Sequence, residues 1–170
     1  MRLSVCVLGS RWLCLALLTS SVALASAPLK NWFNDPFFQV RHRMAGCPQP
    51  LGPYGTEDEM KQQAHSRVER GTSCWRAGKC KKPNAYLYDA DIANDLRRRF
   101  AASRRFADAS LWITVQRRFV YVEGCVRSKR TMSGIEDFVK RTPDVELVIA
   151  NTIVGTGKPN YAVMPARTPG

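Results

Sequence analysis

The sequence lacks the short motifs that mark common hydrolases, metalloproteases and nucleotide-binding proteins. It has no G-x-S-x-G, no H-E-x-x-H and no G-x-x-x-x-G-K-[ST] pattern. Its two histidines, His42 and His65, stand in no recognisable motif. The paired acids Asp89 and Asp91 open an expected helix, where capping explains them better than acid–base chemistry. We therefore predict a protein that is not an enzyme and has no catalytic residues and no cofactor.

Closely spaced cysteine pairs are also missing, although the chain contains six cysteines. Without a C-x-x-C pair, a zinc site and a redox centre are both disfavoured, and we predict no metal. An even number of cysteines follows the N-terminal segment, which is typical of disulfides in an exported chain. These four cysteines, which allow three pairings, are Cys47, Cys74, Cys80 and Cys125.

The N-terminus has no apolar run long enough to cross a bilayer, because its apolar core spans only residues 12–18. Arg2 and Arg11 supply positive charge, and an Ala-Leu-Ala sequence ending at Ala25 has the form of a cleavage site. We predict a signal peptide over residues 1–25 and a periplasmic or otherwise exported protein. Cleavage two residues later and retention as an uncleaved anchor are the alternatives.

Acidic residues are scarce relative to basic ones, with 14 Asp and Glu against 26 Lys and Arg. Loss of the signal peptide would leave a net charge of about +10. Such a surface favours anionic partners. Because an exported protein rarely meets nucleic acid, we favour an anionic envelope component and predict no nucleic-acid partner. The alternative is that the charge only keeps the protein soluble.

Residues 26–88 are predicted to form an N-terminal extension. Its first part is rich in proline and glycine, yet four aromatic residues lie between positions 32 and 38. Disordered tails are poor in aromatics, so this segment is expected to dock, either on its own domain or on a partner. A helix is predicted over residues 56–70, with Thr56 and Glu59 as a capping box. An apolar stripe at Met60, Ala64 and Val68 would face the protein, and a cysteine-containing loop follows.

Two stretches of alternating residues, LWITVQ and FVYVEGCV, predict a β-hairpin around Arg117-Arg118. One face of the hairpin is aliphatic and is expected to lie under helices; it comprises Leu111, Ile113, Val115, Val120 and Val122. The other face carries Trp112, Tyr121 and Cys125. An open face of this kind would be an exposed apolar patch, so we expect it to be covered.

The elements around the hairpin complete the predicted fold. A helix over 89–106 precedes it, and a second helix begins after Ser128 and ends before Pro143. A nearly continuous β-branched strand follows over residues 145–154. The order helix, strand, strand, helix, strand predicts an α+β fold with helices on one face of a three-stranded sheet. Residues 157–170 are expected to be a flexible tail.

Residues 89–156 resemble a BON domain, the "bacterial OsmY and nodulation" module. The resemblance is carried by YDADIANDLRRRF, the ITV strand, FVYVEGCV with Gly124, and VIANTIV with Asn151. The sequence departs from the family at Arg117-Arg118, where a small turn residue is usual, and at Pro143-Asp144, where a glycine is common. Phe138 also stands in a helix that is usually rich in small residues. The resemblance implies an envelope protein that binds phospholipid or attaches larger proteins to membranes.

The arginine-rich helix is the candidate binding site. The predicted lipid-binding residues are Arg97, Arg98, Arg104 and Arg105, with Trp112 as a further candidate. Each basic residue close to an anionic surface contributes roughly 1 kcal/mol. The predicted partner is an anionic phospholipid or membrane surface. The alternatives are an ordinary solvated helix face, or a protein–protein interaction module of an envelope or secretion assembly that uses the aromatic segment.

The cysteines suggest how the open hairpin face is covered. Cys74 and Cys80 can close a small ring, which leaves Cys47 for Cys125 on the open face. The longer bridge would pin the N-terminal segment across that face, and the aromatic residues between 32 and 38 would help to cover it. A link from Cys47 to either other cysteine would overturn this arrangement.

Overall fold

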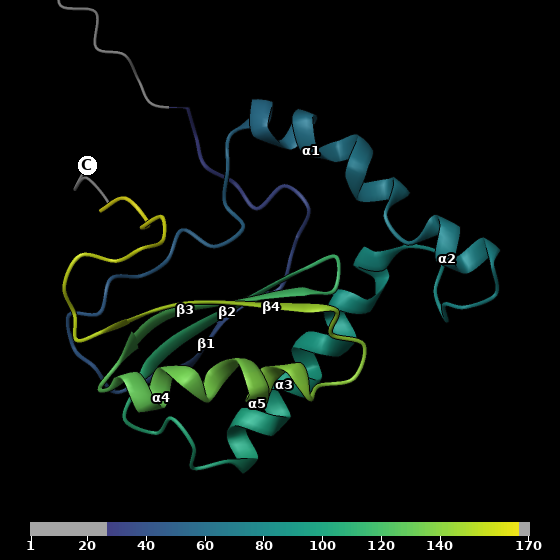
Figure 1. The fold of residues 1–170 in the computed structure, drawn as a ribbon. Helices are drawn as coiled ribbons and strands as arrows, with labels where there is room; N and C mark the ends of the chain where they lie inside the picture. The colour runs from purple at the N-terminus through teal and green to yellow at the C-terminus, as the bar shows by residue number, and fades with distance from the viewer. Residues whose placement is uncertain (1–26, 167–170) are drawn as a thin grey trace, which may run out of the picture.

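The computed structural model describes residues 27–166, so the predicted signal peptide lies outside the described residues. The described chain forms a four-stranded sheet with helices packed on one face (Figure 1). In chain order the elements are β1 (Phe37–His42), α1 (Glu57–Glu69), α2 (Thr72–Arg76), a 3₁₀ helix (Ala85–Tyr88), α3 (Asp89–Ala102), β2 (Ser110–Gln116), β3 (Phe119–Val126), α4 (Lys129–Ser133), α5 (Ile135–Lys140) and β4 (Leu147–Val154).

The sheet has one strand more than the sequence predicted. Its order is β1-β2-β3-β4, with β3 and β4 parallel and the other neighbours antiparallel. The additional strand, β1, comes from the N-terminal extension and pairs with β2, placing Phe37 opposite Thr114 and Phe38 opposite Ile113. The prediction of three strands was wrong because β2 would otherwise present an unpaired edge. The aromatic segment therefore docks, in part, by extending its own domain's sheet.

The aliphatic face of the hairpin lies under the helices, as predicted. All five of its predicted residues are fully buried. They pack in one cluster with Ile92, Leu96 and Phe100 of α3 and with Phe138 of α5. The rings of Phe100 and Phe138 meet edge to face, with their centroids 4.9 Å apart. The large residue at 138 thus fills space in the core, where burying each such side chain contributes about 1.5–3 kcal/mol.

Asp89 joins helix α3 to the hairpin turn and does not cap its own helix, as the sequence had suggested it could. Its buried carboxylate accepts hydrogen bonds from the backbone N–H groups of Arg117 (2.7 Å) and Arg118 (2.8 Å). Both arginines have positive φ angles, 52° and 69°, as the tightest hairpin turns require. Asp89 therefore holds a turn conformation that glycine or asparagine usually provides.

Gly124 occupies the other point of the hairpin where the backbone is tightly constrained. Its φ angle is 135°, and a Cβ atom at this position would lie 2.1 Å from the carbonyl oxygen of Ser110. No side chain fits there without moving strand β2. This explains why a glycine interrupts the otherwise β-branched strand.

Two helices differ from their predicted bounds: one ends earlier than predicted, and the other is divided into two. Helix α3 stops at Ala102, four residues before the predicted end. The Arg41 guanidinium from β1 donates to the carbonyl oxygens of Phe100 (2.7 Å) and Ser103 (2.6 Å), which satisfies the free acceptors of the helix end. The helix predicted after Ser128 divides at Gly134 into α4 and α5.

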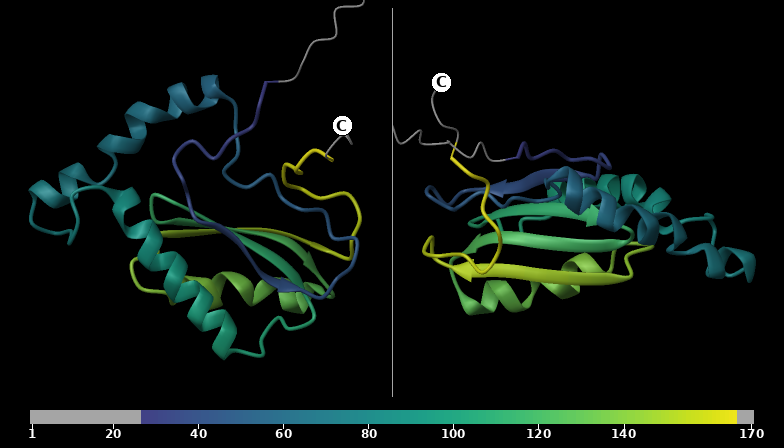
Figure 2. Two further views of the ribbon diagram at one scale, coloured as in Figure 1. Left: turned by 180° about the vertical axis from the view of Figure 1, so that it is seen from behind. Right: turned by 90° about the horizontal axis from the view of Figure 1, so that it is seen from above.

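Helix α1 has the predicted capping box but packs through a different face. Thr56 accepts a bond from the Glu59 backbone N–H, and the Glu59 carboxylate accepts one from the Thr56 backbone N–H at 2.7 Å. Val68 of the predicted stripe is 55% exposed, whereas Arg67 is buried against Asp35. The stripe prediction was wrong at this position because an ion pair anchors the helix. Figures 1 and 2 show α1 and α2 extending away from the sheet, and residues 57–80 are called the arm below.

The second face of the sheet is covered by irregular chain. The disulfides join Cys47 to Cys125 and Cys74 to Cys80, the pairs that the sequence favoured. Residues 47–54 and 160–164, called the cover below, hydrogen-bond to each other over this face. The Leu51 N–H donates to Ala162 (2.7 Å) and the Met164 N–H to Gln49 (3.0 Å). This pairing corrects the expectation of a flexible tail for the described part of the C-terminal segment.

The aromatic residues between 32 and 38 contribute less to this cover than predicted. Phe37 lies on the second face of the sheet, under the cover, where its ring meets that of Tyr54 with centroids 6.1 Å apart. Phe38 packs instead against the helix-covered core. Trp32 donates its indole N–H to the Gly55 carbonyl oxygen at 2.8 Å, and Phe33 lies under the Arg67 guanidinium. The segment is therefore divided among the sheet, the cover and the arm.

Candidate functional site

The first two predicted arginines of α3 are exposed but engaged with neighbours. The Arg97 guanidinium lies 3.8 Å from the centroid of the Phe38 ring and donates to Asn94 Oδ1 at 3.2 Å. Arg98 forms an ion pair with Asp95 one turn earlier on the helix. Exposed ion pairs like that of Arg98 are worth little to stability, so the Arg98 side chain can be rearranged at low cost.

The other predicted residues fall into two places. Arg104 is exposed and follows α3 directly. Arg105 donates to the Gly134 carbonyl oxygen at 3.2 Å and lies over the rings of Phe106 and Phe138. Trp112 lies on the opposite face of the sheet, beside Glu123 in the strand register. The structure therefore does not bring Trp112 together with the arginines.

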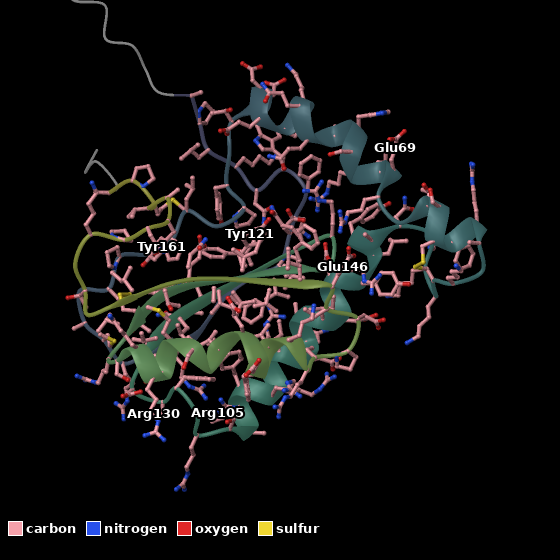
Figure 3. The ribbon with its side chains drawn as sticks, in the orientation of Figure 1. Glu69, Arg105, Tyr121, Arg130, Glu146 and Tyr161 are labelled. Atoms are coloured by element: carbon pink, nitrogen blue, oxygen red, sulfur yellow. A yellow bond between two sulfur atoms is a disulfide. The ribbon has the colours of Figure 1, made fainter. Side chains whose placement is uncertain are left out.

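Basic side chains from three segments meet where α3 ends and α4 begins. The end of β1 is held there by the hydrogen bond from the Arg43 N–H to the Ala109 carbonyl oxygen at 3.0 Å. The junction between α4 and α5 is held by the bond from Arg105 to the Gly134 carbonyl oxygen. Figure 3 shows Arg105 and Arg130 at the same lower edge of the molecule. The group called the basic end below consists of Arg41, Arg43, Arg104, Arg105, Arg127, Lys129 and Arg130.

The members of the basic end have two different roles. Arg41 and Arg105 are committed to backbone carbonyls, so they hold the fold together. Four exposed members have side chains that form no ion pair or hydrogen bond within residues 27–166; they are Arg43, Arg104, Lys129 and Arg130. The acidic residue Asp108 lies 3.9 Å from Arg127. Most of the positive charge at this end is therefore available to a partner.

A shallow hollow of about 340 Å³ lies within the basic end. Its walls include Arg41, His42 and Arg43 from one side and Ser103 and Arg104 from the other. Arginine guanidinium groups bind phosphate oxygens through charge-assisted, often bidentate hydrogen bonds. The floor of the hollow is mainly apolar, with Val40 and Ala107 among its walls, so the free guanidinium groups of Arg43 and Arg104 lie at its rim and face solvent.

Sequence reasoning missed most of the basic end because it followed a single helix. The Arg-His-Arg run at residues 41–43 was the available signal, but its position next to Arg104 depends on β1 joining the sheet. Within the described part of the chain, no group of three or more metal-ligating side chains is present. In the same residues, no helix has the length and apolarity to span a membrane.

Comparison with known families identifies the central part of the fold. Residues 88–156, from the end of the 3₁₀ helix through β4, match the family model of the BON domain. Residues 88–156 are a BON domain. This family is known for association with membranes or phospholipids, its members are often periplasmic or envelope-associated, and they are generally not enzymes. No curated protein and no solved structure matches the chain.

The BON match separates the family module from what this chain adds to it. Helices α3, α4 and α5 and strands β2, β3 and β4 lie within the matched residues. Strand β1, the arm and the cover lie outside them. The basic end draws on both parts, because Arg41 and Arg43 belong to β1 or follow it, while the remaining members belong to the BON domain.

Proposed function

We propose that this BON domain protein is an exported, non-enzymatic envelope protein that adsorbs to anionic phospholipid surfaces through its basic end. The observation that carries the proposal is the convergence of exposed, unpaired basic side chains from three segments at one end of the molecule. The disulfides agree with an oxidising compartment outside the cytoplasm.

The charge at the basic end is sufficient for reversible adsorption. Each basic residue near an anionic bilayer contributes about 1 kcal/mol, so the four free residues together contribute about 4 kcal/mol. This corresponds to weak binding that salt would screen, without insertion into the hydrocarbon region. Arg97 and Arg98 lie earlier in α3, before the basic end, and would add to the attraction only if their local contacts with Phe38 and Asp95 were exchanged for lipid.

Vesicle flotation tests the proposal with two variants of equal charge. In the first, Arg104→Ala and Arg130→Ala remove two free members of the basic end. In the second, Arg76→Ala and Lys79→Ala remove two exposed charges from the arm. At about 1 kcal/mol per residue, the first variant should partition about 30-fold less onto anionic vesicles. Equal losses in both variants, or equal binding of the unmodified chain to neutral and anionic vesicles, would contradict the proposal.

A second candidate function is attachment to another envelope protein through the arm. Trp75 is 47% exposed within the Cys74–Cys80 ring, and Val68 is also exposed on α1. Exposed apolar residues on a projecting element are common at protein–protein contacts. Cross-linking in envelopes distinguishes the two functions. Capture of one dominant protein, lost on Trp75→Ala and accompanied by no vesicle binding, would favour the arm.

A further inference from the structure

A polar cavity lies between the second face of the sheet and the cover. Its volume is about 400 Å³, within the range of small-molecule sites. The sheet contributes Thr114, Gln116, Tyr121, Glu123 and Asn151, and the cover contributes Tyr161 with its neighbours. Figure 3 shows Tyr121 and Tyr161 on the side of the sheet opposite Arg105 and Arg130. The cavity is therefore separate from the basic end.

Glu123 has no cationic partner in this cavity. Its carboxylate forms no ion pair and no hydrogen bond with residues 27–166, and no Lys, Arg or His lines the cavity. This is unusual in a chain with 26 basic residues. Burial raises the pKa of Glu123 to about 7. The pKa of Tyr161 rises to about 12, first because of its own burial and then because of the Glu123 charge.

The polar groups around Glu123 favour a ligand that donates hydrogen bonds. The Tyr161 hydroxyl already donates to the Pro48 carbonyl oxygen at 2.8 Å. The Gln116 side-chain N–H donates to Asp35 at 2.8 Å, which leaves the Gln116 carbonyl oxygen free to accept. Asn151 and Asn160 supply further amide groups, which can accept as well as donate, and the Glu123 carboxylate is the one charged acceptor among the lining residues. A carboxylate with amide oxygens and tyrosine rings around it is suited to an organic cation.

We propose that this cavity binds the primary ammonium group of a small organic ligand, with the Glu123 carboxylate as its counter-ion. An ammonium group has three donors and no acceptor, which matches the free carbonyl and carboxylate oxygens. A divalent metal is a poorer match, because Ca²⁺ is usually held by several charged oxygen ligands and the cavity offers one carboxylate. The volume also exceeds what a bare ion fills.

The cover gives the site a preformed shape. The Cys47–Cys125 disulfide anchors it two residues from Glu123 on the same strand. Backbone bonds between residues 49–51 and 162–164 hold its two segments together. Rigid walls reduce the entropy lost on binding, which matters for a ligand of only a few atoms.

Nuclear magnetic resonance titration of the purified chain with n-butylamine tests the proposal, with 1-butanol as the neutral analogue of equal size. We expect saturable shifts at Glu123, Tyr121 and Asn151 in the millimolar range with the amine alone. Sodium chloride at equal concentration serves as the salt control. Because the chain is strongly basic, general attraction of amines is disfavoured, and saturation reports the cavity.

The isosteric variant Glu123→Gln should weaken amine binding at least tenfold, while Glu136→Gln on the exposed face of α5 should leave it unchanged. Thermal melting confirms that both variants fold. For the unmodified chain, affinity should rise about tenfold between pH 6 and pH 8 as Glu123 ionises, and this dependence should vanish in Glu123→Gln. Tyr121 and Tyr161 are the other titratable groups that line the cavity, and the pKa of Tyr161 is about 12, so its hydroxyl stays protonated over this range.

Three results would overturn the proposal: no saturable shifts with the amine, equal shifts with the alcohol, or equal affinity in Glu123→Gln. Stronger binding of potassium or calcium chloride than of the amine would also overturn it. Vesicles of neutral lipids with ethanolamine headgroups provide a second titration. Shifts with both the free amine and these vesicles indicate a lipid source of the ammonium group, and shifts with the free amine alone indicate a soluble one.

Discussion

The two faces of the sheet are closed in different ways. The helix-covered face is aliphatic, and its central residues Leu111, Ile113 and Val122 are fully buried beneath α3 and α5. The second face carries Thr114, Tyr121 and Glu123, and irregular chain covers it without excluding a cavity of about 400 Å³. Regular helices close a face by matching apolar surfaces. Irregular segments cannot match a surface as well, so a disulfide and a few backbone bonds hold them.

This difference separates stability from binding in the molecule. The helix-covered face should supply most of the folding free energy, because it buries the most apolar area. The second face, under the cover, has the free polar groups, and the basic end has the free positive charges. The predictions below compare the two faces, beginning with the largest expected effect.

Removing the Cys47–Cys125 bridge should be the most costly change. Its cysteines are 78 residues apart, so Cys47→Ala with Cys125→Ala should lower the free energy of unfolding by about 4.5 kcal/mol in the chain-entropy model. The matched control, Cys74→Ala with Cys80→Ala, opens a ring with a separation of 6 and should cost about 2.4 kcal/mol. Denaturant unfolding measures both. An equal or larger loss for the small ring would show that the cover does not depend on its bridge.

Shortening one aromatic residue on each face compares their packing. Phe100→Ala empties a fully buried position on the helix-covered face and should cost about 4 kcal/mol. Phe37→Ala removes a half-buried ring on the covered face and should cost about half as much. Both are measured by urea unfolding. Similar losses would mean that the two faces are packed equally tightly, which would contradict the proposed difference between them.

Asp89→Ala should destabilise the protein by about 2 kcal/mol. The change leaves the N–H groups of Arg117 and Arg118 without their carboxylate acceptor, in a turn whose residues have positive φ angles. Replacing Arg117-Arg118 with Asn-Gly in the same variant should recover part of the loss, because this pair favours the turn without help. No recovery would indicate that Asp89 acts through α3 and not through the turn.

The second face of the sheet should also make the stability of the protein depend on pH. The pKa of Glu123 is about 7 in the folded protein against 4.5 for the ordinary group, so the folded chain retains a proton that the unfolded chain loses. The free energy of unfolding should therefore decrease as pH rises from about 4.5 to about 7 and then level off. Glu123→Gln should flatten this part of the profile, measured by urea unfolding at several pH values. An unchanged slope would place the responsible group elsewhere, with buried Asp89 the next to test.

The sequence predicted the hairpin and its faces because side chains in a strand alternate with a period of two. It also predicted which residues of α3 face the core, because residues such as Ile92 and Leu96 recur at helical spacing within one segment of the sequence. Strand β1 could not be predicted in the same way, because it directly follows Pro36 and pairs with β2, a strand that lies about 70 residues later in the sequence. Burial of Arg67 likewise depends on Asp35, which lies 32 residues away in the sequence.

The candidate site was predicted only in part, because it too depends on contacts between segments that are distant in the sequence. Helical spacing identified Arg104 and Arg105, but it also grouped them with Arg97 and Arg98, whose contacts are local. Trp112 was included although its strand position places it on the other face, which the alternation of the hairpin already implied. The contributions of Arg43 and Arg130 depend on tertiary contacts between segments that are far apart in the sequence.

Paramagnetic relaxation on anionic bilayers tests the central claim most directly. The isotope-labelled chain is mixed with anionic nanodiscs that contain a gadolinium-chelating lipid, and the broadening of each backbone amide is measured. Adsorption through the basic end predicts the strongest broadening at Arg43, Arg104 and Arg130, with little at Trp75. Strongest broadening around Trp75, or uniform broadening over the molecule, would contradict it.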